Sequence, residues 1–301
     1  MKKLFSLLLA GLMIVSLSAC SDKKEEETDL DEYLNDEIVI DEYTNEVTGE
    51  TFHFADVTSD TVKITKYEGP DLPHAVEIPS EVSIEVEENG VTRTITKTIT
   101  GIDDLAFYAL SNITEVKIPN TITLIGDMAF AECRQLTSVT IPVSVQELGQ
   151  AAFKGCVNLK SITFEAGSKM TAIPDAAFMH CTALESLTVP GNIETIGKAA
   201  FQGCESLKSI VIEEGVKVIG EQAFQNCKAL EALTLPASLT EIKASPVENE
   251  KGEEEAKNFN FWGCEALYIE NVTVPADANS VAAKYIASLK LQNKPVEEPA
   301  A

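Results

Sequence analysis

The chain has 301 residues, of which 45% are hydrophobic, so it is long enough and apolar enough to bury the core of one large domain or two ordinary ones. Its formal net charge is −25, from 48 acidic and 23 basic residues. Because proteins hold nucleic acids with lysine and arginine side chains that displace counterions from the phosphates, this charge argues against nucleic acid as a partner.

The first 19 residues are typical of a secretory signal peptide. A short basic start precedes the apolar run Leu4–Val15, which is too short to span a membrane. Residues 17–20 read Leu-Ser-Ala-Cys and resemble a bacterial lipobox, which implies that Cys20 is lipidated. The alternative is an ordinary cleaved signal with an incidental cysteine. We expect an exported protein that is lipid-anchored at the bacterial cell surface, because two or more acyl chains on Cys20 form a stable anchor.

Residues 20–49 predict an acidic, disordered stalk. The stretch 21–50 contains 13 acidic residues and 2 lysines, with few apolar side chains. Such a segment cannot bury enough surface to offset the entropy lost on ordering, so we expect it to extend and to lift the folded part away from the membrane. A calcium site is a weaker alternative, since the spacing lacks the Asp-x-Asp-x-Asp-Gly order of a cation-binding loop.

Residues 50–101 predict a β-rich N-terminal cap. The segments TFHF and TVKIT alternate in polarity, and SIEVEENGVTRTITK is typical of a β-hairpin. Asn89-Gly90 suits the two positive-φ positions of a tight hairpin turn. The peptide VEIP at 76–79 matches later peptides of the same pattern, so we expect this cap to begin a repeat.

A nine-residue motif recurs along residues 102–276. The segment IGDMAFAEC at 125–133 is followed by four similar copies, at 148–156, 173–181, 196–204 and 219–227. The repeated phenylalanines are separated by 23, 23, 25, 23, 23 and 37 residues and are Phe107, Phe130, Phe153, Phe178, Phe201, Phe224 and Phe261. Self-similarity at this period predicts a solenoid, because one such unit cannot bury its apolar face alone.

Each repeat contains two hydrophobic periods. In IGDMAFAECRQL the apolar residues recur at steps of three to five, which predicts a short helical turn. In SVTIP, Val139 and Ile141 alternate with polar residues, which predicts a strand with one face inward that ends at Pro142. An α/β repeat follows: a curved solenoid with a concave parallel sheet on one side and short helical turns on the other.

The consensus I-G-x-x-A-F-x-x-C-x-x-L-x-x-[VI]-x-[IL]-P resembles the BspA-like leucine-rich repeats of bacterial surface proteins, over about residues 70–276. The resemblance implies a non-enzymatic protein that adheres to host extracellular-matrix proteins or to other bacteria. We expect about seven units. An acidic insert at 244–258 predicts a mobile surface loop, and 277–301 predicts a C-terminal capping helix with a frayed tail.

Six cysteines stand three residues after the repeat phenylalanine: Cys133, Cys156, Cys181, Cys204, Cys227 and Cys264. Three interpretations are open. The first is a column of buried free thiols, since cysteine behaves as a small hydrophobe and Leu110 occupies the same position in the first unit. The second is one or more disulfides, because equivalent residues of stacked units lie near 4.8 Å apart. The third is a metal site, which the absence of C-x-x-C pairs and clustered histidines disfavours.

The sequence predicts no enzyme, no metal and no cofactor. His180 beside Cys181 is the one arrangement that resembles a base and a nucleophile. Neighbouring residues in a turn point in different directions, however, and Cys181 belongs to the inward row. No nucleophile-elbow, zinc-protease, phosphate-loop or dinucleotide-binding motif occurs in the sequence.

The outward strand positions are the best candidates for ligand binding. Of the fourteen such positions, nine are serine or threonine and two are charged, whereas 24% of the whole chain is charged. The candidate residues are Ser138, Thr140, Ser161, Thr163, Ser186, Thr188, Ser209 and Thr234. A neutral strip of hydroxyls suits an extracellular protein or glycan held by many weak hydrogen bonds. The plainer interpretation is a solvated strand face, for which threonine is also suited.

The function that we expect is therefore a lipid-anchored, cell-surface binding module for adhesion or for protein or glycan recognition. The alternative is a structural spacer or a docking scaffold for other envelope proteins.

Overall fold

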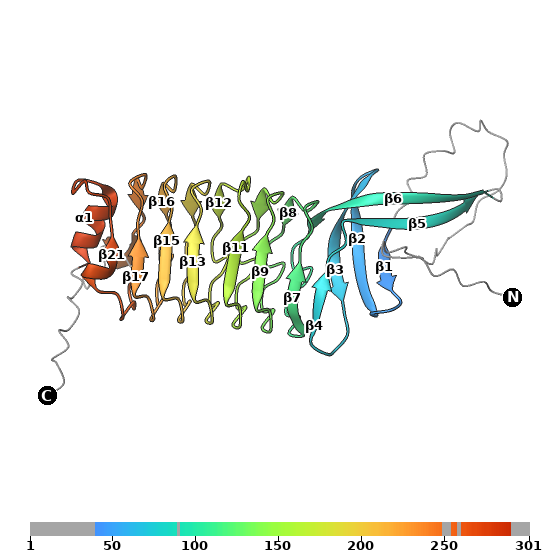
Figure 1. Cartoon of the computed structure of the whole chain (residues 1–301), viewed down its shortest axis with the longest axis horizontal. Coiled ribbons are helices and arrows are strands. Elements are labelled where there is room, and N and C mark those ends of the chain that lie inside the picture. Colours follow the sequence, from blue (N-terminus) through green and yellow to red (C-terminus); the bar gives the residue numbers. More distant parts are fainter. Residues whose placement is uncertain (1–39, 89–90, 249–253, 258–259, 290–301) are drawn as a thin grey trace.

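The computed structural model describes residues 40–88, 91–248, 254–257 and 260–289. Repeated units stand side by side along the long axis of the molecule, between a β-rich cap and a C-terminal helix (Figure 1). The expected signal peptide, Cys20, residues 20–39 of the expected stalk, Asn89-Gly90 and the tail from 290 onward lie outside the described residues.

The N-terminal cap is a mixed sheet that continues into the repeat. Strands β1, β2 and β3 pair antiparallel, β5 and β6 form an antiparallel hairpin, and β3 pairs parallel with β6. The strands are β1 (Glu42–Asn45), β2 (Glu50–Thr58), β3 (Thr61–Glu68), β5 (Glu81–Glu88) and β6 (Val91–Ile102). The hairpin cap that the sequence predicts is confirmed, and it extends away from the stack (Figure 1).

The folded part begins earlier than the expected boundary at residue 50. Ile40 is only 1% exposed, and β1 pairs with β2. The Tyr43 ring stacks on Phe52 at a centroid distance of 6.4 Å. Residues 40–49 therefore belong to the cap and not to a disordered stalk, because a few apolar side chains within this acidic segment reach the core.

One parallel strand per unit forms what we call the long row. Its strands are β4 (His74–Glu77), β7 (Ile113–Lys117), β9 (Ser138–Ile141), β11 (Ser161–Phe164), β13 (Ser186–Val189), β15 (Ser209–Ile212), β17 (Ala232–Thr234) and β21 (Val272–Thr273). Equivalent residues pair across units, as Val139 does with Ile162 and Leu187 with Ile210. Most inward residues of these strands are buried, and the row is hydrogen-bonded in three parts, β4–β7, β9–β11 and β13–β15–β17–β21, which confirms the predicted parallel strands.

A second row of two-residue strands, the short row, lines another side of each unit. It contains β8 (Leu124–Ile125), β10 (Glu147–Leu148), β12 (Ala172–Ile173), β14 (Thr195–Ile196), β16 (Val218–Ile219) and β18 (Glu241–Ile242). β6, β8 and β10 pair in parallel, and so do β12, β14, β16 and β18. The sequence placed the isoleucine of the I-G pair on a helical turn. The structure places it in this strand, which is too short to show a period of two.

The segments expected to be short helical turns are hydrogen-bonded turns without helix. Within each motif two residues four positions apart have positive φ, for example Met128 at 53° and Glu132 at 61°. The Ala131 N–H donates within the turn to the Met128 carbonyl at 3.0 Å, whereas the Phe130 N–H donates to Ala152 of the next unit at 2.8 Å. The positive φ angles are incompatible with an α-helix, which requires negative φ throughout. The hydrogen bonds between units join each turn to the next one.

A column of phenylalanine rings runs through the core. The seven repeat phenylalanines are at most 6% exposed, and successive ring centroids lie 4.8 to 5.6 Å apart with nearly parallel planes. Tyr67 of the cap stacks on Phe107 at 5.0 Å, and Tyr285 lies 6.0 Å from Phe261 at the other end. Both ends of the column are therefore covered by aromatic side chains.

The predicted C-terminal capping helix is confirmed as α1 (Val281–Ser288). The Ala283 N–H donates to the side chain of its N-cap residue, Ser280, at 3.1 Å, and Ala282, Tyr285 and Ile286 are buried against the last unit. A 3-10 turn, η2 (Ile269–Asn271), precedes β21. Among the residues that the structure describes, no helix has the length and apolar content needed to cross a membrane.

The acidic insert differs from the expected loop over its described residues. Strands β19 (Ser245–Glu248) and β20 (Glu254–Lys257) pair antiparallel, with Ser245 opposite Lys257. Backbone pairing between these strands gives the insert a regular arm on each side of residues 249–253, which are not described. Because the segment is acidic, its sequence predicts a mobile loop and not this hairpin.

We predict that Gly197→Ala lowers the free energy of unfolding by about 1–3 kcal/mol, the usual cost of overpacking. A Cβ at Gly197 would lie 2.6 Å from the backbone nitrogen of Asp175 in the preceding unit, which cannot move independently of the stack. Urea denaturation of the chain from residue 21 onward measures the change. The neighbouring variant Lys198→Ala is the control, since it removes only a partly exposed ion pair with Glu221 and should cost less than about 1 kcal/mol. Equal losses in the two variants would contradict close unit-to-unit packing.

Candidate functional site

The eight candidate hydroxyl residues, Ser138, Thr140, Ser161, Thr163, Ser186, Thr188, Ser209 and Thr234, lie on the outward face of the long row. We call this set the hydroxyl strip. Pairing aligns its members across units, since Thr140 lies opposite Thr163, and Ser186 opposite Ser209. Val211, which is 40% exposed, interrupts the strip opposite Thr188. The structure thus brings residues up to 96 positions apart, 138 to 234, into one surface.

The strip hydroxyls differ from several serine and threonine hydroxyls elsewhere in the solenoid. Elsewhere, hydroxyls link neighbouring units: Thr137 donates to the Thr114 carbonyl at 3.1 Å, Ser144 to Ile122 at 2.7 Å and Ser238 to Val216 at 2.8 Å. Within the described part of the chain, no side-chain hydrogen bond joins a strip hydroxyl to another protein group. The strip therefore keeps its donors and acceptors for water or a ligand.

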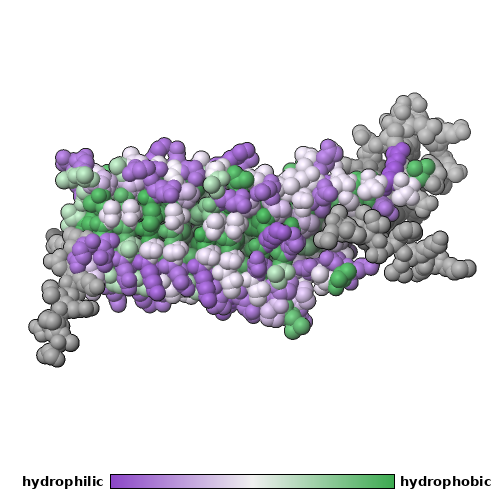
Figure 2. Space-filling model, viewed as in Figure 1, coloured by the Kyte–Doolittle hydropathy of each residue, from purple (hydrophilic) through white to green (hydrophobic). Residues whose placement is uncertain are grey.

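The surface around the strip has a banded polarity. Figure 2 shows pale and hydrophobic residues along the middle of the face over the long row, bordered on both sides by hydrophilic residues. Thr140, Thr163 and Thr188 are exposed, whereas Ser138, Ser209 and Thr234 are partly buried. A weakly polar band with a charged rim has the build of an interaction surface.

The six repeat cysteines form a buried column of free thiols beside the phenylalanines. Each sulfur donates to the carbonyl of the phenylalanine in the preceding unit, from Cys133 to Phe107 at 3.1 Å through Cys227 to Phe201 at 3.5 Å. Burial raises the pKa of Cys133 and of Cys204 to about 12. These contacts favour the first of the three interpretations and describe a structural row of unreactive thiols.

The structure separates the histidine and cysteine that are adjacent in sequence. His180 is exposed and has a φ of 61°, whereas Cys181 is fully buried. The imidazole therefore lies outside and the thiol inside, and they do not form a nucleophile and base. Among the described residues, no group of three or more histidine, cysteine or acidic side chains is arranged to hold a metal ion.

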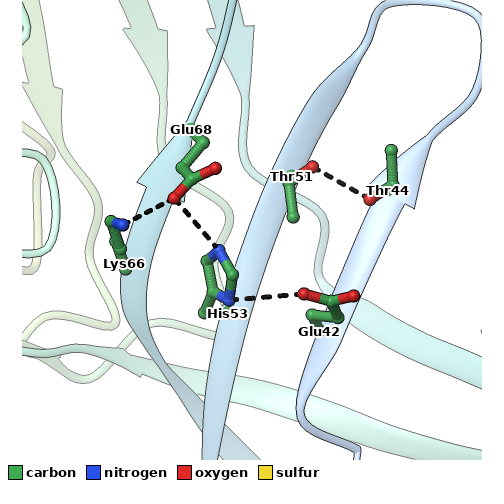
Figure 3. Close-up of polar contacts among 6 residues, drawn as sticks. All are labelled: Glu42, Thr44, Thr51, His53, Lys66 and Glu68. Atoms are coloured by element: carbon green, nitrogen blue, oxygen red, sulfur yellow. Dashed lines mark hydrogen bonds and ion pairs between the residues drawn. The ribbon is translucent and has the colours of Figure 1, made fainter.

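Sequence reasoning did not identify two polar clusters of the cap. The first lies across β1, β2 and β3, where His53 stands 3.7 Å from both Glu42 and Glu68 (Figure 3). Lys66 contacts the Glu68 carboxylate at 2.5 Å, and this hydrogen bond holds the pKa of Glu68 below its ordinary value. Beside this cluster the hydroxyls of Thr44 and Thr51 lie 2.9 Å apart. These contacts join the three strands on an open face.

The second cluster lies at the start of the aromatic column. The Tyr67 hydroxyl lies 2.8 Å from Glu50 Oε1 and 2.8 Å from His74 Nε2, and Thr48 donates to Glu50 Oε2 at 2.7 Å. Burial, followed by the hydrogen bond to Glu50, raises the pKa of Tyr67 far above its ordinary value. The network satisfies the polar end of the tyrosine that covers Phe107, so it has a structural explanation. Its members are scattered in sequence and carry no motif.

The family described as BspA type leucine rich repeat region matches residues 91–205 and 171–294, in six copies. The two matches together cover 91–294, which is 204 of the 301 residues. Among curated proteins, none matches the chain in sequence.

Solved bacterial structures are similar at low identity. A leucine-rich repeat protein from Eubacterium ventriosum is 21% identical over 65% of this chain, with a TM-score of 0.48, and this chain spans 54% of that protein. A leucine-rich repeat protein of T. pallidum is 22% identical, with a TM-score of 0.44, over 81% of this chain and 95% of its own. The pneumococcal vaccine antigen PcpA is 16% identical, with a TM-score of 0.36, over 65% of this chain and 70% of its own.

The thiol column predicts a specific loss of stability in alkali. Because the folded-state pKa values of the buried thiols lie above their unfolded values, their contribution is complete below about pH 8.5 and is lost as the pH rises toward about 12. Each thiol adds a slope of up to about 1.4 kcal/mol per pH unit in that range. Urea denaturation between pH 8 and 10 should therefore show a shallower decline for Cys204→Ala than for the unchanged chain.

A thiol count provides the control for this prediction. The chain from residue 21 onward contains six cysteines, and all six should react with a thiol reagent in denaturant but not in the native state at pH 8. Rapid reaction of the native protein, or identical alkaline slopes for the two chains, would contradict a buried column.

Proposed function

Because the chain belongs to the BspA-type leucine-rich repeat family, we propose that it is a non-enzymatic binding module that recognises an extracellular protein or glycan through the hydroxyl strip. The proposal covers the folded part of the chain from residue 40 to 289. Its role is adhesion or recognition at the cell surface, which fits a rod-like stack that presents the strands of the long row side by side along its length (Figure 1).

One observation carries the proposal. Several hydroxyls on the other sides of the solenoid donate to carbonyls of the preceding unit, as Thr137 and Ser144 do. The strip hydroxyls have no such role in the described structure, and the strands that bear them are already held by backbone pairing. A set of aligned, exposed and uncommitted hydroxyls supports ligand binding better than it supports a purely structural purpose.

The size of the surface supports a polymer as the ligand. Strip residues come from five successive strands, β9, β11, β13, β15 and β17. At about 4.8 Å between neighbouring strands, this arrangement spans roughly 20 Å. Each weak hydrogen bond contributes only about 0.5–1.5 kcal/mol, so useful affinity requires a partner that contacts several units together. An extended polypeptide or an oligosaccharide chain meets that requirement.

We further propose that the protein is exported and lipid-anchored at the bacterial surface through Cys20. The support is the apolar run Leu4–Val15 followed by Leu-Ser-Ala-Cys. An anchor at Cys20 would leave residues 21–39 between the membrane and the first described residue, Ile40. The acidic composition of that segment favours an extended conformation.

Substitutions on the strip test the binding proposal. Thr140→Lys, Thr163→Lys and Thr188→Lys each place a long charged side chain on an exposed position of the long row, so each should weaken binding by at least about tenfold. Binding is measured against immobilised extracellular-matrix proteins and a glycan array. Thr171→Lys is the matched control, because Thr171 is exposed beside the short row and should leave binding unchanged.

Circular dichroism of each variant shows that the fold is retained. If the unchanged protein binds a partner and all three strip variants bind it equally well, the strip is not the ligand surface. If no matrix protein or glycan binds, and crosslinking in cells captures only envelope proteins of the same organism, the spacer or scaffold function replaces the proposal.

The anchor has its own test. Cys20→Ser removes the acceptor thiol, so the variant should lose incorporation of labelled fatty acid and should move from the membrane fraction to the medium or the soluble envelope fraction. Cys133→Ser, which alters a buried thiol of the solenoid, is the control and should keep the label. Retention of the label by Cys20→Ser would contradict the proposed anchor.

A further inference from the structure

One repeat of the solenoid is longer than its neighbours. Phe153 and Phe178 are 25 residues apart, whereas the adjacent steps are 23. The two extra residues lie in the loop after β11, where residues 165–170 occupy the place that 142–145 occupy in the preceding unit. The buried residues Val145 and Met170 end these two loops equivalently, so the insertion is accommodated on the outer side.

The insertion coincides with a break in the long row. β11 pairs with β9 and β13 pairs with β15, but β11 and β13 belong to separate sheets; the row has one other interruption among the described strands, between β7 and β9, where no insertion occurs. The last backbone bond between the two units before the break runs from Glu185 N to Lys160 O at 3.2 Å. Beyond it, β11 and β13 form no paired ladder, although both strands are fully described. The parallel sheet of the long row is therefore interrupted between these two strands.

A groove of about 720 Å³ opens at this break. Half of the hydroxyl strip lines it, since Ser161 and Thr163 lie on one wall and Ser186 and Thr188 on the other. The inserted loop contributes Ala166 and Gly167, whose φ is 84°. The groove is thus a continuation of the strip and not a separate cavity.

Two carboxylates give the groove a negative charge. Glu165 Oε2 accepts the Val143 N–H at 2.9 Å, and Glu213 Oε2 accepts the Gly191 N–H at 3.1 Å. These bonds fix both side chains, and the second oxygen of each carboxylate has no hydrogen bond or ion pair to another described residue. No lysine or arginine lines the groove. Both charges are therefore uncompensated by the groove itself.

The groove also contains an aromatic side chain. Phe164 is partly buried, lines the groove, and packs edge-on against Phe178 with centroids 6.4 Å apart. Carboxylates pair with cations through charge-assisted hydrogen bonds, and aromatic rings attract the same groups. Hydroxyls alone would suit a neutral sugar, but two fixed negative charges and a ring favour a cationic side chain.

We propose that this groove is the subsite in which the hydroxyl strip binds a lysine or arginine side chain of an extended, basic polypeptide segment. The inference rests on the proposed function and narrows its ligand to protein. The four strip hydroxyls that line the groove supply donors and acceptors for the main chain of such a segment, and the Glu165 and Glu213 carboxylates bind its cationic group.

Fluorescence anisotropy with two labelled twelve-residue peptides tests the proposal. The probe is a peptide of six Ser-Lys repeats, and its uncharged counterpart has six Ser-Gln repeats. We expect the chain from residue 21 onward to bind the first and not the second. The double variant Glu165→Gln/Glu213→Gln should bind the Ser-Lys peptide at least about tenfold more weakly. Glutamine retains a carbonyl oxygen for the Val143 and Gly191 N–H groups, so both loops should keep their structure.

The matched control removes the same charge elsewhere. Glu147→Gln/Glu241→Gln changes two exposed carboxylates of the short row and should leave the affinity within about twofold of the unchanged chain. Equal weakening of both double variants would show only a general attraction to an acidic protein and would overturn the proposal. Equal binding by the groove variant and the unchanged chain would also overturn it.

A further comparison distinguishes failure of the groove proposal from failure of the proposed function. If Thr140→Lys abolishes binding to a matrix protein or glycan but the groove variant does not, the strip binds its partner without the subsite, and the inference fails while the proposed function stands. A second outcome would show that the groove binds a glycan and that the inference is wrong. In that outcome the unchanged chain binds a neutral oligosaccharide such as cellohexaose but not the Ser-Lys peptide, and the groove variant no longer binds the oligosaccharide.

Discussion

The structure depends on the stacking of one phenylalanine ring per unit. Successive centroids lie 4.8 to 5.6 Å apart, close to the spacing of about 4.8 Å between hydrogen-bonded strands. Because the two spacings match, one stack of rings and two rows of parallel strands can share the same axis. An inner ring has both faces covered only when units lie on either side of it. A ring at either end needs a cap, which Tyr67 and Tyr285 provide.

This constraint divides the surface into committed and free positions. The cysteines donate to phenylalanine carbonyls, the motif glycines allow close backbone approach, and hydroxyls such as that of Thr137 link one unit to the preceding one. The outward residues of the long row are not needed for these contacts. Stacking therefore requires particular residues at most positions of each repeat. It leaves one aligned surface, the outward face of the long row, whose composition the fold does not dictate. Function is most easily placed on that surface and on the loops beside it.

Much of this architecture could be predicted from sequence, because the same pattern of core residues recurs in each repeat. The period of Phe107 to Phe224, the alternation of Val139 and Ile141, and the helical spacing after residue 277 all corresponded to observed features. Other features had no local signal. Two-residue strands are too short to show alternation of polarity. Positive φ at Met128 and Glu132 could not be predicted, because neither residue is glycine. Pairing of β1 with β2, and of β19 with β20, depends on segments whose acidic composition is typical of unstructured chain.

The candidate site was predicted in part. The strip residues were identified by alternation, but two further features are properties of the assembled stack: the lack of side-chain hydrogen bonds from the strip hydroxyls to other described residues, and the groove at the 25-residue repeat. Hydrogen–deuterium exchange of the protein with and without a bound partner tests the central claim that the long row is the ligand surface. The account predicts added protection confined to β9 through β17 and strongest at β11 and β13. Protection confined to the short row or to the motif turns, with the long row unchanged, would contradict it.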